Sequence, residues 1–236
     1  YTIKYVFRLG QGIGYVRINK FSETTGDELD EAMAKLDEES LTGLVLDLRD
    51  NPGGALSQAL AVSDRFLKKG QVIVSTLNRS GRGREFRAKE GGKYKYPMVV
   101  LINRNSASAS EIVSGALQDH DRALIVGETS FGKALVQTVF PLEGNRGLAL
   151  TTGKYLTPSN RLIQRDYSSS FYEYYLTRSD NPGAESKDFQ TDSGRTVFGG
   201  GGITPDQEVA LDSYSSLVRM INRKQFFVAF AAKLVD

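Results

Sequence analysis

The 236-residue sequence contains no cysteine, and this absence excludes disulfide bonds, thiolate nucleophiles and cysteine-ligated zinc from the chain. It contains one histidine, His120, so a site that needs several imidazoles is excluded, although a metal site made of carboxylates alone stays open. No apolar run reaches the roughly 20 residues that a transmembrane helix needs. The sequence opens on Tyr1 without an initiator methionine or a signal peptide, so we expect a module or mature fragment.

The sequence also lacks an excess of charge of either sign. Thirty basic and twenty-eight acidic side chains leave a formal net charge of +2, so no global field indicates nucleic acid, a membrane surface or an acidic substrate as partner. What the sequence does have is 40% hydrophobic residues. Together with the length, this content predicts a globular protein with a sizeable core and one or two domains.

Apolar periodicity divides the sequence into alternating strands and helices. Strands are predicted over residues 13–21, 44–48, 72–77, 98–103, 123–126 and 134–140. Helices are predicted to start near Ser22 or Thr25, to run from Leu56 to Leu67, to begin again over 106–116, and to form the tail over 215–234. This order predicts an α/β domain with crossover connections, a largely parallel central sheet and flanking helices.

Two stretches interrupt this alternation. Residues 78–96 are basic, contain glycine and are weakly patterned, so we expect a mobile hairpin or loop rather than core. Residues 167–195 are rich in tyrosine, serine, aspartate and asparagine, which predicts a surface insertion within one domain over 1–236. That insertion is either a plain excursion or a segment that touches substrate.

A serine-rich segment, Asn105-Ser106-Ala107-Ser108-Ala109-Ser110-Glu111, leads from a predicted buried strand into a helix. A serine at a helix N-terminus has free backbone N–H groups beside it, and the positive end of the helix dipole stabilises an oxyanion there. The segment therefore predicts a nucleophile site. The alternative is that these serines only cap the helix, because serine is a preferred capping residue.

A glycine-punctuated turn, Gly127-Glu128-Thr129-Ser130-Phe131-Gly132-Lys133, joins two apolar strands. Phe131, Ala134 and Leu135 flank the lysine, and loss of water there disfavours the ammonium form. A neutral lysine can take a proton from a serine hydroxyl. The alternative is an ordinary solvated lysine near a turn.

The same turn nearly matches the phosphate-binding P-loop, because Gly127, Gly132 and Lys133 occupy its fixed positions after an apolar strand. Ala134 stands where a hydroxyl should bind magnesium, which counts against nucleotide binding. A serine-histidine-aspartate triad is a further alternative, with Asp119 and Asp121 beside His120. Neighbours in sequence point in different directions, and a lone histidine after a helix is more typical of a surface or dipole partner.

Four stretches together resemble the carboxyl-terminal processing (tail-specific) proteases, peptidase family S41, whose core is related to the crotonase and ClpP folds. They are residues 43–54 (GLVLDLRDNPGG), 106–111 (SASASE), 127–133 (GETSFGK) with Gln137, and 202–206 (GITPD). Lys133 follows Ser108 by 25 positions, and Gln137 follows Lys133 by four, which is similar to the family pattern.

The resemblance implies a role for each matching residue. Ser108 would be the nucleophile, Lys133 the general base and Gln137 the residue that orients the lysine. The backbone N–H of Ala109, with that of Gly53 or Gly54, would form the oxyanion hole. No metal or cofactor is implied.

The resemblance also implies a substrate and a setting. The substrate would be a protein or peptide with an accessible C-terminal tail, cleaved through an acyl-enzyme. The PDZ domain usual in this family is missing, and we expect it before residue 1. Action outside the cytoplasm, in the bacterial periplasm or cell envelope, is expected on the same ground. The alternative function is a catalytically idle peptide-binding module of the same fold.

Overall fold

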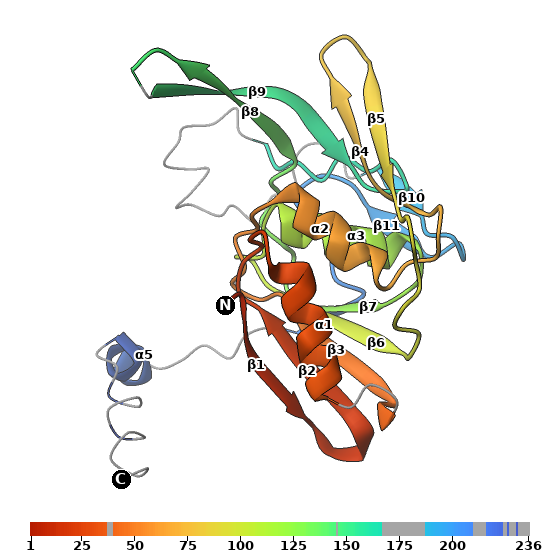
Figure 1. Cartoon of the computed structure of the whole chain (residues 1–236), viewed down its shortest axis with the longest axis vertical. Coiled ribbons are helices and arrows are strands. Elements are labelled where there is room, and N and C mark those ends of the chain that lie inside the picture. The colour runs from red at the N-terminus through yellow and green to blue at the C-terminus, as the bar shows by residue number, and fades with distance from the viewer. Residues whose placement is uncertain are drawn as a thin grey trace.

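The structure is a computed structural model that describes residues 1–36, 40–144, 146–166, 187–209 and 216–223, together with Phe226 and Phe230. Its helices are α1 (Thr25–Lys35), α2 (Leu56–Asp64), α3 (Ala109–Asp119), α5 (Ser216–Arg223) and the short 3-10 turn η1 (Gly10–Gly12). Its strands form a six-stranded sheet, a four-stranded sheet and a small hairpin (Figure 1).

The six-stranded sheet has the order β1-β2-β3-β6-β7-β12. Its members are β1 (Ile3–Arg8), β2 (Ile13–Ile18), β3 (Gly43–Asp47), β6 (Met98–Ile102), β7 (Leu124–Gly127) and β12 (Gln207–Glu208). All neighbouring pairs are parallel except β1 with β2. The predicted α/β fold with a largely parallel central sheet is therefore confirmed.

Register explains where the core of this sheet lies. Val16 is the partner of Leu46, Leu46 of Val100, and Val100 of Ile125. All four side chains are completely buried, so one apolar row crosses four adjacent strands. Val45, Val99 and Val126, which point to the other face, are only partly buried, so the sheet is covered more deeply on the face of this apolar row.

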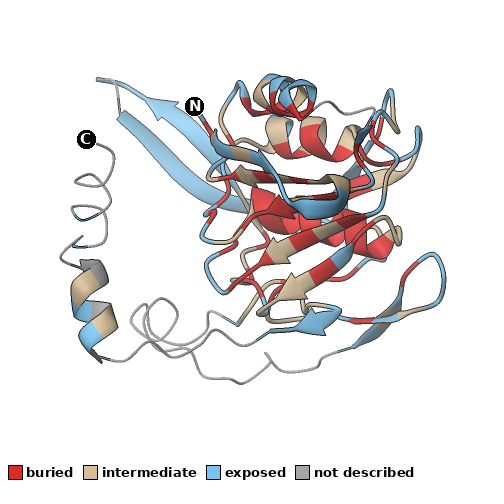
Figure 2. Cartoon of the chain, turned by 90° about the horizontal axis from the view of Figure 1, so that it is seen from below, coloured by how far each residue is buried: buried red, intermediate tan, exposed pale blue. Residues whose placement is uncertain are grey.

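The second sheet is antiparallel with the order β5-β4-β9-β8. Its strands are β4 (Val72–Asn78), β5 (Gly83–Arg87), β8 (Leu135–Leu142) and β9 (Arg146–Leu156). Helix α3 contacts β7 of the first sheet and β4 of the second, and every residue of α3 is buried. The helix therefore forms part of a layer between two sheets, while the β8–β9 hairpin projects from the body and is exposed along most of its length (Figures 1 and 2).

The structure corrects the expectation for residues 78–96. This stretch does form a hairpin arm, with β5 paired to β4, but it also enters the core, because Ala88 and Tyr94 are almost fully buried. Tyr94 is held there by a hydrogen bond from its hydroxyl to Asp30 (2.8 Å) and by packing against Phe66. The many charged residues of the stretch obscure the apolar signal of these two residues, so the sequence does not predict that they are buried.

Other differences concern segments with weak patterns. Strand β9 was not predicted, and neither was the hairpin of β10 (Asp188–Gln190) and β11 (Thr196–Phe198), which begins inside the expected insertion. Residues 167–186 of that insertion lie outside the described residues, as do residues 215, 224–225, 227–229 and 231–234 of the expected tail helix. Within the part of the chain that is described, no helix is long and apolar enough to span a membrane.

Candidate active site

Ser108 lies between β6 and α3, at the residue that caps the helix N-terminus. Its backbone has φ 53° and ψ −110°, a left-handed conformation that costs energy for any residue except glycine. The side chain is half-buried rather than sealed. A strained, partly accessible serine at the positive end of a buried helix is suited to a nucleophile that develops negative charge beside it.

The neighbouring serines have other tasks. The Ser106 hydroxyl donates to the Leu48 carbonyl (2.8 Å) and accepts from the Asn103 N–H, while the Ser110 hydroxyl donates to the Asn51 carbonyl (3.0 Å). Both residues are completely buried. Among the described residues the Ser108 hydroxyl donates to no such carbonyl, so it is the one hydroxyl of the three whose proton is available to a base.

A buried carboxylate joins the serine to the lysine-bearing turn. Glu111 is completely buried, and its Oε2 accepts from the backbone N–H of Ser108 (2.8 Å) and of Lys133 (2.9 Å). Its Oε1 accepts from the Ser130 hydroxyl and from the Gly132 N–H, both at 2.6 Å. One carboxylate thus positions the backbone of both predicted catalytic residues.

The pKa of the Glu111 carboxyl is raised, because burial has a larger effect than the hydrogen bonds to the carboxylate. Burial raises the pKa of its carboxyl, and hydrogen bonds from Ser130, Lys133, Gly132 and Ser108 oppose that rise. Both oxygens are filled by donors, so the carboxylate is the form that this arrangement fits. Sequence reasoning assigned no role to Glu111. Its spacing of three residues after Ser108 is the capping-box pattern, a signal that could have identified it.

The lysine-bearing turn is packed against the run of four glycines. Gly132 has φ 87°, and a Cβ there would lie 2.8 Å from Arg165 Cβ and 3.1 Å from the backbone of Gly201. A Cβ on Gly202, which has φ 111°, would lie 2.6 Å from the Ser130 carbonyl oxygen. Only glycine fits these approaches, so the run between Phe198 and Ile203 forms the wall that places Lys133.

The side chains of Lys133 and Gln137 are less constrained. Lys133 is half-buried just before β8, and Gln137 is exposed on β8. Within the described part of the chain, no hydrogen bond joins the Lys133 ammonium to the Ser108 hydroxyl or to the Gln137 amide. The structure thus brings Ser108 and Lys133 together through their backbones, by way of Glu111, without a hydrogen bond between the two side chains among the described residues.

Two backbone N–H groups beside Ser108 have no acceptor among the described residues, those of Ala109 and Gly54. The Gly53 N–H, in contrast, donates to Asn51 Oδ1 (2.9 Å). A Cβ on Gly53 would lie 2.8 Å from Ser108 Cβ and 2.9 Å from the Ala109 nitrogen, so this loop packs directly against Ser108. Of the two glycines named from the sequence, Gly54 is therefore the one whose backbone N–H is available to bind an oxyanion.

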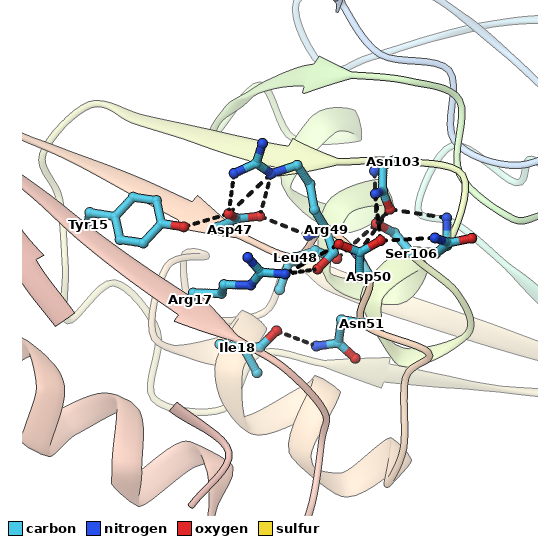
Figure 3. Close-up of polar contacts among 11 residues, drawn as sticks. Tyr15, Arg17, Ile18, Asp47, Leu48, Arg49, Asp50, Asn51, Asn103 and Ser106 are labelled. Atoms are coloured by element: carbon cyan, nitrogen blue, oxygen red, sulfur yellow. Dashed lines mark hydrogen bonds and ion pairs between the residues drawn. The ribbon is translucent and has the colours of Figure 1, made fainter. Parts of the chain in front are cut away.

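A polar network fixes the loop that carries these glycines (Figure 3). At the end of β3, Asp47 accepts from the Tyr15 hydroxyl (2.6 Å) and from the Arg49 guanidinium (2.7 Å). Burial raises the pKa of Asp47, but the hydrogen bonds from Arg49 and Tyr15 outweigh it and lower the pKa overall. Asn51 donates to the Ile18 carbonyl (2.8 Å), so residues 47–54 are held from both sides.

The same network reaches the serine segment. Asp50 accepts from the Asn103 and Asn105 amides, both at 2.9 Å, and the Asp50 N–H donates to Asn103 Oδ1. The Asn51 carbonyl accepts from the Ala107 N–H (3.0 Å). Strands β3 and β6 are adjacent and parallel, and these contacts lock the two loops that follow them into one unit.

Neither alternative site fits the geometry. His120 follows the last residue of α3, about 18 Å along the helix from Ser108, where it bonds Asp192 and the Val72 carbonyl. The turn that resembles a P-loop leads into strand β8 rather than a helix, and its Gly132 and Lys133 N–H groups already bind the Glu111 carboxylate. The described residues contain no group of three or more side chains suited to hold a metal ion.

Fold and site together define a mixed α/β protein in which a strained serine, a lysine-bearing turn and N–H groups without an acceptor among the described residues come together. A family model described as peptidase family S41 matches residues 12–168. The chain belongs to peptidase family S41, which confirms the family inferred from the four sequence stretches.

Relatives and solved structures agree with this assignment. The carboxy-terminal-processing protease of Bartonella bacilliformis is 48% identical over 163 residues, which are 67% of this chain and 38% of that protein. The corresponding protease of Synechocystis sp. is 42% identical over 158 residues, 67% of this chain and 37% of that protein. Among solved structures, a photosystem II D1 C-terminal processing protease gives a TM-score of 0.64 at 30% identity, covering 84% of this chain and 42% of that one. The chain thus spans less than half the length of these proteins.

Proposed function

We propose that this chain is the catalytic core of a serine endopeptidase that uses Ser108 as nucleophile and Lys133 as general base. The observation that carries the proposal is the shared Glu111 Oε2, which accepts from the backbone N–H of both residues beside a helix N-terminus. The family assignment supports peptide-bond hydrolysis as the reaction.

The proposed reaction has two halves. Ser108 Oγ attacks the substrate carbonyl carbon while its proton passes to the neutral Lys133 Nζ, and the carbonyl oxygen becomes an oxyanion. The N–H groups of Ala109 and Gly54 donate to this oxyanion. The C–N bond then breaks as Lys133 returns the proton to the leaving amine, which leaves an ester on Ser108. Water, deprotonated by Lys133, attacks the ester carbonyl carbon, the C–Oγ bond breaks, and Lys133 returns the proton to Ser108 Oγ. Gln137 orients the lysine throughout.

The proposed substrate is a protein or peptide cleaved near an accessible C-terminal tail. Support comes from the names of the relatives, which are carboxy-terminal processing proteases. We place the activity outside the cytoplasm, in the periplasm or cell envelope, on the same family ground.

Cleavage of an unfolded reporter protein tests the proposal. We expect the unmutated chain to cut it, joined if necessary to a PDZ domain. Ser108→Ala and Lys133→Ala should lower the rate at least about a thousandfold, because each removes an essential partner in the covalent step. Two exposed residues provide matched controls, Ser57→Ala on α2 and Lys154→Ala on β9. Equal rates in the Ser108 variant and the unmutated chain would refute the proposed nucleophile.

A further inference from the structure

The outer edge of strand β8 is unpaired among the described residues. In the sheet order β5-β4-β9-β8, strand β8 stands last, with β9 on one side only. The strand begins at Leu135, two residues after Lys133, and continues to Leu142. Pro141 lies near its far end, and proline is tolerated where a strand edge is not paired. The free edge therefore starts at the candidate active site and leads away from it.

One face of the projecting hairpin is apolar. Register places Thr138 opposite Leu150, Phe140 opposite Leu148, and Leu142 opposite Arg146, and residues directly opposite share a face. The large apolar members of this face, from 43% to 53% exposed, are Phe140, Leu142, Leu148 and Leu150. We call these four residues the hairpin apolar face.

The opposite face of the hairpin is different. There the register pairs Gln137 with Thr151 and Val139 with Ala149, so Val139 stands among small and polar side chains. Along β8, alternate residues return from Phe140 through Thr138 to Val136, which is half-buried. Thr138, whose hydroxyl bonds the Thr152 hydroxyl (2.8 Å), and a register shift between Val136 and Gln137 separate the hairpin apolar face from the partly buried start of the strand.

We propose that an extended segment of the substrate polypeptide adds to the outer edge of β8 as a further strand, with alternate side chains against the hairpin apolar face. The inference rests on the proposed function and specifies its substrate as an unfolded segment with apolar residues at every second position. Strand addition supplies backbone hydrogen bonds without regard to sequence, and the face next to the edge selects side chains. The eight residues of β8 span about 27 Å, enough for about six to eight substrate residues on one side of the cleaved bond.

Two features favour this occupant. Its path is fixed at one end by Ser108 and Lys133, whose backbones meet at Glu111. Its backbone must also be extended, because a strand edge offers donors and acceptors to an extended chain only. The experiment must distinguish a substrate segment from a second copy of this chain bound to the same face.

The experiment uses the Ser108→Ala protein, so that binding is measured without turnover. The probe is a fluorescein-labelled peptide of about twelve alternating valine and serine residues, prepared with a single N-methyl group moved along it one residue at a time. N-methylation removes one backbone donor. We expect affinity to fall about fivefold at every second position, which corresponds to one lost hydrogen bond, and to change little at the positions between.

Side-chain variants test the face itself. Phe140→Ser and Leu150→Ser should each weaken peptide binding about tenfold with an unchanged melting temperature. Val139→Ser, 66% exposed on the opposite face, is the matched control and should bind as before. Equal affinities for all N-methyl peptides, or equal effects of Val139→Ser and Phe140→Ser, would overturn the inference. So would a change in sedimentation mass, from dimer to monomer, as the sole effect of Phe140→Ser.

Failure of the inference and failure of the proposed function differ in outcome. If the unmutated chain cleaves the reporter but the methyl scan shows no period of two, strand addition is wrong and the protease stands. If the scan shows the period but the unmutated chain does not cleave, with or without the added PDZ domain, the chain is a peptide-binding module and the catalytic proposal is wrong.

Discussion

Replacement of Glu111 is the perturbation for which the structure gives the sharpest prediction. Four donors converge on its carboxylate, and because Glu111 is completely buried, solvent does not readily replace a lost acceptor. In Glu111→Gln, the new amide NH₂ can replace Oε1, where the Ser130 hydroxyl is able to accept instead of donate. Of the three backbone donors, only the Gly132 N–H then loses its acceptor, and the Ser130 O–H has to find another one.

The expected cost follows from that count. One buried, unpaired N–H costs about 1–3 kcal/mol, so Glu111→Gln should lower the free energy of unfolding by about 2 kcal/mol. The retained oxygen still accepts from Ser108 and Lys133, so reporter cleavage should persist at a reduced rate. Glu111→Leu leaves three backbone donors unpaired, namely those of Ser108, Gly132 and Lys133. It should cost about 4 kcal/mol or more and abolish cleavage.

Urea unfolding and reporter cleavage, measured on the same preparations, check both values. Glu23→Gln, an exposed glutamate in the turn before α1, is the matched control and should change neither quantity. If Glu111→Leu unfolds within about 1 kcal/mol of the unmutated chain, the low end of the cost of a single unpaired donor, and cleaves at the same rate, the carboxylate does not position the two loops and our reasoning about the site is wrong.

Three further predictions concern the frame of the site. Gly202→Ala should abolish cleavage and lower the melting temperature, because its Cβ would lie 2.6 Å from the Ser130 carbonyl oxygen; an unchanged thermal melt would contradict this. Arg161→Met should lower the free energy of unfolding by about 3–5 kcal/mol, because it leaves the buried carboxylate of Asp119 without its ion-pair partner. Urea titration measures the loss, and a change below about 1 kcal/mol would contradict a stabilising role of this ion pair. Burial raises the pKa of Glu28, but hydrogen bonds from Thr24, Ile3 and Thr2 lower it to about 2. Because the folded pKa is depressed, Glu28 stabilises the fold above its ordinary pKa of 4.5, and this contribution is lost as pH falls toward about 2. Glu28→Gln should therefore flatten acid unfolding over that range, and an identical acid transition in both proteins would count against the contacts with β1.

Much of the fold could be predicted because the parallel strands are short apolar runs bounded by turn residues. The prediction for 44–48, for example, became β3 at Gly43–Asp47. Strand β9 carries no such signal: it is exposed along most of its length, and its hairpin projects beyond the core. Tyr94 was missed for a related reason, because its burial depends on Asp30 and Phe66, both distant in sequence.

The candidate site likewise has features that the sequence predicts and features that depend on contacts between distant segments. Ser108, Lys133 and the glycines occur in short motifs, so their types and spacing could be read directly. The shared contact of Ser108 and Lys133 with Glu111, and the use of the Gly53 N–H by Asn51, depend on how loops from different strands meet. Local sequence does not contain that information.

The most direct test of the catalytic proposal is covalent labelling by a serine-directed phosphonate, followed by mass spectrometry of the intact protein and of its peptides. We predict one adduct, on Ser108, which forms faster in the folded chain than in a denatured control. Labelling should be strongly slowed by Lys133→Ala and unaffected by Ser57→Ala. An adduct on another residue, or labelling of Ser108 no faster than in the denatured control, would contradict the serine-lysine dyad and favour the peptide-binding module.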